Sequence, residues 1–394
     1  MATVPGQTES DTVVELSGAL IARRSVTPDD AGCQDLIARR LKAAGMTVES
    51  LDVEDVCNLF ARHGQGSPHL MLLGHTDVVP PGPEADWSSP PFAPTLRDGK
   101  LYGRGAADMK SSVAAFVVAL EQWLAACPDH PGTISLLLTS DEEGSARHGV
   151  RAVVPWLERH QLLPDACLVG EPSGRDRLGD VIRIGRRGSI QASLKVFGRQ
   201  GHTAYAAPQD NPVHRAAPLL AALARLEFDD GDEHFPPTRL QVSNLQAGTG
   251  ADNVTPGELI VMFNLRNNPN TGADELEQRL RRLIGDLDPG PYELDWRISG
   301  EPFGPATGLL PGVVQAACRS VLGHAPAADT GGGTSDGRFL GSLGIPVVEL
   351  GPVNRSIHQV DEHIALDDLR RLPGLYRAVI NGFLNAAAQP CASS

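Results

Sequence analysis

Short apolar runs alternate along the chain with segments of helical pattern, and this alternation constrains the fold more than any other feature. The clearest apolar runs are Leu70–Leu73, Thr133–Thr139, Ala166–Val169 and Ile345–Leu350, and the clearest helical segments are Val113–Ala126, Val150–His160 and Asp367–Ala386. Strands that are apolar almost throughout are typical of parallel sheets, because helices cover both faces of such sheets. The sequence therefore predicts an α/β unit with a mostly parallel central sheet flanked by helices.

The middle of the chain follows a different pattern. Its strand candidates are Ile190–Phe197, Leu240–Leu245, Glu258–Arg266 and Tyr292–Ile298, and its helix candidates are Pro212–Leu226 and Glu275–Ile284. Ile190–Phe197 alternates apolar and polar residues, as a strand does when only one of its faces is buried. The order β-α-β-β-α-β is typical of a small two-layer α+β domain. We therefore predict an inserted domain at residues 188–300, between residues 1–187 and 301–394 of one discontinuous domain.

The charge balance argues against one broad class of partner. The chain has 34 Lys and Arg against 48 Asp and Glu, a formal net charge of −14. It therefore lacks the basic footprint of a general nucleic-acid binder. An anionic substrate would need a local positive pocket to overcome the long-range repulsion of such a chain.

Neither a membrane span nor a secretion signal is indicated by the sequence. The apolar run Val113–Leu120 is far shorter than the roughly 18 residues that a membrane helix requires. Residues 1–16 lack a basic segment followed by an apolar stretch. The six cysteines, Cys391 among them, are scattered without a C-x-x-C pair, which is typical of thiols in a reducing cytosol. We therefore expect a cytoplasmic protein.

Five candidate metal ligands stand at the ends of predicted strands or in the loops beside them: His75, Asp108, Glu143, Glu171 and His358. Ligand sites in α/β sheets lie at the carboxyl ends of the strands, so we expect these side chains to converge on one edge. A single histidine at a strand end is usually structural, but the coincidence of all five favours a site. Two histidines and three carboxylates suit Zn²⁺ or a similar ion, and they suffice for two ions if one carboxylate bridges them.

Two neighbouring acidic residues have positions that suit supporting roles. Asp77 lies two residues after His75, on the same side of an extended chain, so it can orient that imidazole. Glu142 and Glu143 point apart if their backbone is extended. One of the two can then bind metal while the other acts as a general base on a water molecule. Two metal ions about 3.5–4 Å apart would hold a hydroxide and polarise a carbonyl.

Four motifs carry a resemblance to a known family: His75–Asp77, Gly103–Lys110, Asp141–Gly144 and Gly170–Pro172. From about residue 12 to 386 the chain resembles the di-zinc aminoacylase/carboxypeptidase family, which includes acetylornithine deacetylase and glutamate carboxypeptidase. Closer features, Asp86–Phe92, Gly185–Ser189, Gly332–Phe339 and Gly351–Glu362, select one subfamily. The resemblance implies hydrolysis of N-succinyl-LL-2,6-diaminopimelate to succinate and LL-2,6-diaminopimelate, a step toward lysine and peptidoglycan in bacteria.

The resemblance also implies a role for each residue of the centre. His75 and Glu171 would bind one zinc ion, Glu143 and His358 would bind the other, and Asp108 would bridge the two. Cobalt can substitute for zinc in such centres. Glu142 would be the general base, and Asp77 would support His75. The family has a non-proline cis peptide after the bridging aspartate, which here is the bond between Asp108 and Met109.

Substrate and subunit contacts are implied in the same way. Arg186, Arg266, Thr334 and Asn354 would hold substrate carboxylates. Arginine suits this task because its guanidinium group binds a carboxylate through two parallel hydrogen bonds. His202, Tyr205 and Asn253 belong to the inserted domain, and the resemblance implies that they complete the active site of the other subunit in a homodimer. His202 would stabilise the oxyanion that forms on the substrate.

Two other interpretations remain open at this point. The first is a sibling hydrolase, such as an acetylornithine deacetylase or a dipeptidase. Arg186, Thr334 and Asn354 argue against it, because an acetyl group has no distal carboxylate to hold. The second is a metal-binding or interaction protein without catalysis, and the general-base candidate Glu142 argues against that one. We expect an anionic small-molecule substrate, and neither nucleic acid nor membrane as a partner.

Overall fold

The structure, a computed structural model, describes residues 9–387 of the chain. Cys391 and the first eight residues of the N-terminal segment considered above lie outside the described residues. The chain divides into two compact units: Met1–Gly185, Gly304–Asp329 and Ser335–Ser394 form the larger unit, and Arg186–Phe303 and Thr330–Thr334 form the smaller one. The predicted domain boundaries stay a prediction, because compactness alone does not establish a folding domain.

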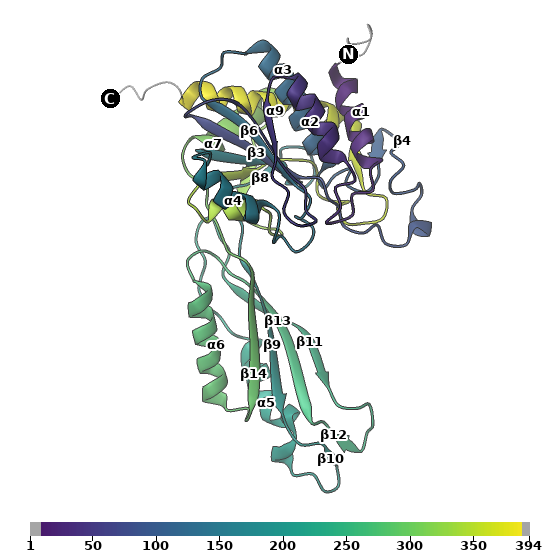
Figure 1. The fold of residues 1–394 in the computed structure, drawn as a ribbon. Coiled ribbons are helices and arrows are strands. Elements are labelled where there is room, and N and C mark those ends of the chain that lie inside the picture. The colour runs from purple at the N-terminus through teal and green to yellow at the C-terminus, as the bar shows by residue number, and fades with distance from the viewer. Residues whose placement is uncertain (1–8, 388–394) are drawn as a thin grey trace, which may run out of the picture. The chain divides into compact units, whose positions relative to one another are not determined.

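A mixed sheet of eight strands forms the centre of the larger unit, in the order β1-β2-β6-β3-β7-β16-β8-β15 (Figure 1). Its strands are β1 (Thr47–Ser50), β2 (Asn58–Gly64), β3 (His69–His75), β6 (Thr133–Thr139), β7 (Ala166–Val169), β8 (Val181–Arg183), β15 (Ala327–Asp329) and β16 (Val347–Glu349). The four central strands β6, β3, β7 and β16 run parallel, and β1 and β2 extend the sheet in antiparallel pairing. β3, β6 and β7 are buried along their whole length, because helices cover both faces.

Helices cover the two faces of this sheet unequally. One face packs against α1 (Glu9–Ile21), α2 (Cys33–Ala43), α3 (Lys110–Ala126), α7 (Leu309–Leu322) and α9 (Leu366–Ala387) in one large core. α3 is apolar almost all round, which is typical of a helix that is buried on every side. The other face packs against α4 (Val150–Arg159) and α8 (Gly337–Gly341). The predicted α/β class is thus confirmed.

Three short strands form a separate small sheet in the same unit, in the order β17-β5-β4. They are β4 (Thr95–Arg97), β5 (Lys100–Tyr102) and β17 (His363–Ala365), and the 3-10 turn η1 (Glu84–Asp86) precedes them. β17 pairs antiparallel with β5, with His363 opposite Tyr102. This pairing brings the segment before β17 next to the loop after β5, although about 260 residues separate them along the chain.

The smaller unit is a four-stranded antiparallel sheet in the order β11-β13-β9-β14 (Figure 1). Its elements are β9 (Ser189–Phe197), β10 (Gly201–His202), η2 (Pro208–Asp210), α5 (Pro212–Leu223), β11 (Arg239–Ala247), β12 (Val254–Thr255), β13 (Glu258–Arg266), α6 (Ala273–Leu287) and β14 (Tyr292–Gly300). Alternate residues of β9 and β13 pack with α5 and α6 into a second core. The predicted β-α-β-β-α-β order is confirmed, with the two-residue strands β10 and β12 as an addition.

Some predicted elements differ from the structure at their ends. The strand predicted at Ile345–Leu350 covers only Val347–Glu349, because Pro346 has no N–H to donate to a neighbouring strand. The helix predicted at Pro212–Leu226 ends at Leu223.

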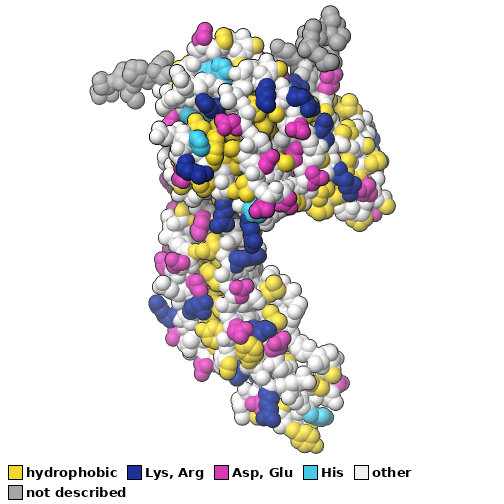
Figure 2. Space-filling view, in the orientation of Figure 1, with side chains coloured by type: hydrophobic (Ala, Val, Ile, Leu, Met, Phe, Trp, Pro, Cys, Tyr) yellow, Lys and Arg dark blue, Asp and Glu magenta, His cyan; other side chains and the backbone are white. Residues whose placement is uncertain are grey.

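Within residues 9–387, no helix combines the length and the apolar character that crossing a membrane requires. On the face drawn in Figure 2, basic side chains of the larger unit are interspersed with acidic ones.

Candidate metal centre

The five candidate ligands come from separate segments of the larger unit that meet at one edge of its sheet. His75 ends β3, Glu143 lies in the turn after β6, and Glu171 follows β7. Asp108 lies in the loop before α3, and His358 lies in the loop between β16 and β17. The parallel register places His75 opposite Thr139 and Leu73 opposite Val169, so the three strands end at the same level. The predicted convergence therefore follows from strand pairing.

Asp108 lies between two histidines and separates the donor atoms into two groups. Its Oδ1 lies 3.2 Å from Nε2 of His75, which in turn lies 3.6 Å from Oε1 of Glu171. Its Oδ2 lies 3.3 Å from Nε2 of His358, which lies 3.0 Å from Oε1 of Glu143. Within each group the donor atoms lie within 4.8 Å of one another. Two histidine–glutamate pairs that share one carboxylate fit two bound cations in the predicted arrangement. The peptide bond between Asp108 and Met109 is cis, as the resemblance implies.

Asp77 organises the centre through both its main chain and its side chain. Nδ1 of His75 lies 2.9 Å from the main-chain oxygen of Asp77 and 3.5 Å from its Oδ1. Donation of the Nδ1 proton to Asp77 leaves Nε2 of His75 as the atom that faces Asp108. The carboxylate of Asp77 also accepts the N–H groups of Glu142, at 3.4 Å, and of Glu143, at 3.1 Å. Sequence reasoning missed this second role.

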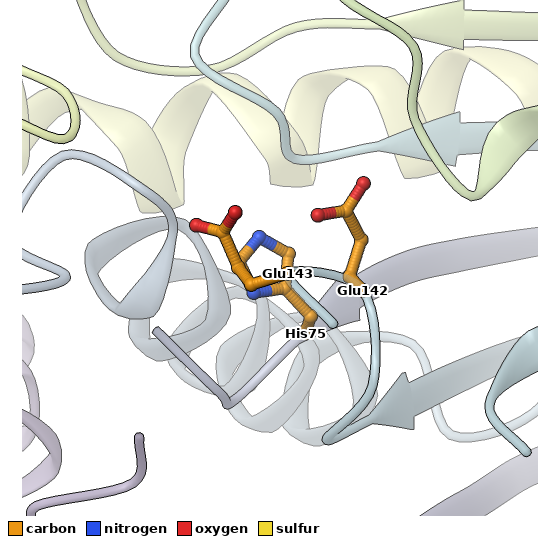
Figure 3. Close-up of side chains that lie close together, drawn as sticks. All are labelled: His75, Glu142 and Glu143. Atoms are coloured by element: carbon orange, nitrogen blue, oxygen red, sulfur yellow. The ribbon is translucent and has the colours of Figure 1, made fainter. Parts of the chain in front are cut away.

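The backbone at Glu142 and Glu143 is a turn, so the condition under which the two side chains would point apart, an extended backbone, is not met. The carboxylate of Asp77 holds both N–H groups and thereby bends the chain. Figure 3 shows the consequence: both carboxylates extend to the same side of the segment, and they do not point in opposite directions. One donor atom from each lies within 4.8 Å of the other and of a ring nitrogen of His75. The division of roles between the two glutamates stays a prediction.

The electrostatics of the centre indicate a need for positive charge. Burial, followed by the charges of nearby carboxylates, raises the pKa of Glu142 and of Glu171 well above the ordinary value. Hydrogen bonds to Asp108 and Glu143 raise the pKa of His358 to about 10. Burial opposes protonation of His75, but hydrogen bonds to Asp108 and Asp77 outweigh it and raise the pKa of that imidazole. Burial thus disfavours the negative charges of Glu142 and Glu171, and nearby divalent cations would offset this cost.

Two buried aspartates behind the centre were also missed by sequence reasoning. Asp141 accepts the backbone N–H groups of Ser145, Arg147 and His148, which shapes the segment that follows the glutamates. The carboxylate of Asp336 is buried and accepts no hydrogen bond from the described residues, and burial raises its pKa to about 7. Asp141 and Asp336 both lie in motifs noted above, but a sequence motif does not reveal which hydrogen-bond donors lie next to a carboxylate in the fold.

The candidate substrate residues are divided between the two units. Arg186, Arg266 and Thr334 belong to the smaller unit, and Asn354 belongs to the larger one. Arg186 is buried, and its Nη1 donates to the main-chain oxygen of Gly331 at 2.7 Å. Burial and the nearby charge of Arg187 lower the pKa of Arg266. The structure thus places a concentration of guanidinium groups in the smaller unit.

The three residues assigned to the partner's site lie together in the smaller unit. His202 pairs with Val254 between β10 and β12, next to Asn253. The main-chain oxygen of Asn253 accepts the N–H of Thr203 at 2.9 Å. The ring of Tyr205 lies 5.5 Å from that of His202, and the side chain of Tyr205 is 89% exposed. These side chains are therefore grouped away from the core of their own unit.

The sequence profile of peptidase family M20/M25/M40 matches residues 71–382, and the chain belongs to this family. This finding confirms the family resemblance given by the motifs. Curated relatives named succinyl-diaminopimelate desuccinylase come from Stenotrophomonas maltophilia (strain R551-3) and Xylella fastidiosa (strain M12). The first is 56% identical over 373 residues, which cover 94% of this chain and 99% of the relative. The second is 55% identical over 374 residues, which cover 94% of this chain and 98% of the relative.

Solved structures of more distant proteins share the fold. An M20 family metallo-carboxypeptidase from Sulfolobus solfataricus superposes with a TM-score of 0.76 at 16% identity, over 95% of this chain and 99% of that one. A dinuclear metal-binding peptidase of the M20 family from Bacillus subtilis has a TM-score of 0.71 at 17% identity, over 95% and 98% of the two chains. Each likeness covers 95% of this chain, so the described parts of both units share the fold of these proteins.

Proposed function

We propose that the chain hydrolyses N-succinyl-LL-2,6-diaminopimelate to succinate and LL-2,6-diaminopimelate, with two divalent metal ions in each subunit. The observation that carries the reaction class is the position of Asp108, whose two oxygens face two separate histidine–glutamate pairs. The assignment of the substrate rests on 56% sequence identity to a desuccinylase over 94% of the chain. Such hydrolysis belongs to the synthesis of diaminopimelate and lysine.

The grouping of the donor atoms supports a division of the ligands between two ions. His75 and Glu171 would hold one zinc ion, His358 and Glu143 would hold the other, and Asp108 would bind both; Co²⁺ can replace Zn²⁺ in a centre of nitrogen and oxygen donors. When bound, the ions lower the pKa of an attacking water and polarise the scissile carbonyl. The chain's own part is to keep these five side chains aligned and to move protons.

Glu142 is the general base of this proposal. Its carboxylate lies beside the centre without belonging to either histidine–glutamate pair, and burial favours its protonated form. Bound cations would favour its ionised form, and an ionised carboxylate can accept a proton. Glu142 then accepts a proton from the attacking water and delivers it to the nitrogen of the departing amine.

Substrate recognition depends on the cationic residues. Arg186, Arg266, Thr334 and Asn354 hold carboxylates of the substrate, which an acidic chain attracts only through local positive charge. His202 stabilises the oxyanion and, with Tyr205 and Asn253, serves the site of the second subunit in a homodimer formed through the smaller unit, which acts as a lid. Support for this comes from the exposure of Tyr205 beside His202 and from the edge position of strand β11.

A substrate panel tests the proposal. Purified protein is stripped with a chelator, reloaded with Zn²⁺ or Co²⁺, and assayed on N-succinyl-LL-2,6-diaminopimelate, N-acetylornithine and a dipeptide. We expect metal-dependent release of succinate and slow or no turnover of the other two substrates. Faster turnover of N-acetylornithine or of the dipeptide would instead identify a sibling hydrolase. Metal binding without turnover of any substrate would identify a binding protein.

A further inference from the structure

A buried carboxylate outside the proposed ligand set holds the loop that carries Asp108. Glu362 is completely buried and immediately precedes β17. Its Oε1 accepts the N–H groups of Ala107, at 2.9 Å, and of Asp108, at 3.0 Å. Its Oε2 accepts the N–H of Gly105 at 3.0 Å and a hydrogen bond from Nη1 of Arg104 at 2.7 Å. One side chain therefore fixes three backbone groups of a single loop.

The main chain of Glu362 contacts the same loop. Its carbonyl oxygen accepts the N–H of Gly103 at 2.9 Å, and this bond continues the ladder between β17 and β5. The loop curls tightly around the carboxylate, with Gly105 at a φ of 84°. A Cβ atom at Gly105 would lie 2.7 Å from the side chain of Val78 and 3.0 Å from that of Lys110. Glycine is therefore required for this close approach.

Arg104 extends the same connection to the segment that carries His358. Its guanidinium group is buried, and Nη1 donates to the main-chain oxygen of Gln359 at 3.2 Å as well as to Glu362. Gln359 is the residue directly after His358. The pair formed by Arg104 and Glu362 thus joins the Asp108 loop to the His358 loop. Across that junction, Oδ2 of Asp108 lies 3.3 Å from Nε2 of His358.

We infer that Glu362 is a positioning residue that sets the separation of Asp108 from His358 and thereby the affinity of the centre for metal. The inference rests on the proposed dinuclear centre. Outer-shell groups that hold metal ligands change metal affinity or activity by about 10- to 100-fold when they are replaced. Glutamine at this position keeps the shape of the side chain but puts an NH₂ group, which can only donate, against backbone N–H groups. Either orientation of the amide places donor against donor, so the loop has to shift.

The test compares Glu362→Gln with a matched control in the smaller unit. Asp229 also accepts two backbone N–H groups, from Gly231 and Thr238, and two side-chain donors, from Asn268 and Thr271. Metal-free wild type, Glu362→Gln and Asp229→Asn are titrated with Co²⁺, and the visible absorption of the bound ion and competition with a chelator are recorded. We expect Glu362→Gln to lose about 10- to 100-fold in Co²⁺ affinity and to change the absorption bands. Asp229→Asn should lower the unfolding temperature without changing Co²⁺ binding.

The outcomes separate this inference from the proposed function. Equal affinity and equal absorption bands in wild type and Glu362→Gln would overturn the role of Glu362 while leaving the metal centre intact. A wild type that binds no Co²⁺ would instead contradict the proposed centre itself. If Glu362→Gln does not fold, Glu362→Asp and Arg104→Lys are measured in the same way. Unchanged Co²⁺ affinity in both of those variants would equally overturn the inference.

Discussion

Replacement of Asp77 gives the most specific structural prediction. The carboxylate is fully buried and accepts the N–H of Glu143 at 3.1 Å and, more weakly, that of Glu142 at 3.4 Å. A hydrogen bond to a charged group contributes about 1.5–3 kcal/mol to stability. Because the two N–H groups are only partly buried, the loss of both bonds should cost less than twice that value. We therefore expect Asp77→Ala to lower the unfolding free energy by about 2–4 kcal/mol. Asp77→Asn keeps one acceptor oxygen but sets its NH₂ group against the other N–H, so it should lower the unfolding free energy by about as much as Asp77→Ala does.

The effect on catalysis should exceed the effect on substrate binding. Without Asp77 the turn that carries Glu142 and Glu143 loses its anchor, so kcat should fall by about 10- to 100-fold in Asp77→Ala while KM changes little. The His75 imidazole retains the main-chain oxygen of Asp77 as a hydrogen-bond acceptor, so one ion should remain bound.

A matched variant at the opposite end of the sheet controls for stability. Asp165 precedes β7 and accepts the N–H of His69 at 2.7 Å together with the hydroxyl of Ser67. Asp165→Ala should lower the unfolding free energy yet keep kcat and metal content. Denaturant unfolding, steady-state kinetics and metal analysis of the three variants provide the comparison. An Asp77→Ala protein with wild-type kcat and two bound ions would refute the reasoning.

Three further predictions concern specificity, assembly and pH. Arg186→Ala should reduce kcat/KM for succinylated substrates by about 10- to 150-fold, the equivalent of a charge-assisted hydrogen bond of about 1.5–3 kcal/mol. It should reduce kcat/KM for acetylated substrates far less. Equal losses on both would mean that Arg186 does not contact the succinyl carboxylate. Glu142→Ala and His202→Ala proteins should each be nearly inactive alone, but a mixture of the two should regain roughly a quarter of wild-type activity after subunit exchange. Random pairing makes about half of the dimers mixed, and each mixed dimer has one intact site. If mass measurement verifies the exchange and no activity returns, His202 serves the site of its own subunit. Without metal, the pKa of His358 is raised from 6.5 to about 10. The stabilisation of the folded state by protonated His358 is therefore complete below about pH 6.5 and is lost as the pH rises through 10. The unfolding temperature of metal-free protein should fall over that range, and a flat profile would contradict this.

The convergence of His75, Glu143 and Glu171 could be predicted because parallel strands impose it. Once β3, β6 and β7 are assigned as neighbouring parallel strands, the residues that follow them have to meet at one edge. The apolar character of these strands is visible along the sequence, and so are the histidine and glutamates at their ends. Asp108 and His358 are further candidates from the loops beside these strands, and the family resemblance implies which ion each of the five would bind.

The contacts that shape the loops could not be predicted in the same way. The strands β4, β5 and β17 have three residues each, which is too short for a recognisable alternation. The contact of Glu362 with the Asp108 loop depends on the pairing of β17 with β5, across more than 250 residues of chain. The turn at Glu142 and Glu143 depends on the side chain of Asp77, and the local sequence alone does not show whether this segment is extended or turned.

Glu142→Gln offers the most direct test of the central claim, that this centre hydrolyses a succinyl amide with Glu142 as its base. Metal content and succinate release are measured on the same samples of wild type and variant, loaded with Zn²⁺. The account predicts two ions per chain in both proteins and a loss of turnover of at least about 10²-fold in the variant, since general-base catalysis contributes roughly 10²- to 10⁴-fold. Turnover near the wild-type rate by Glu142→Gln with both ions bound would contradict it.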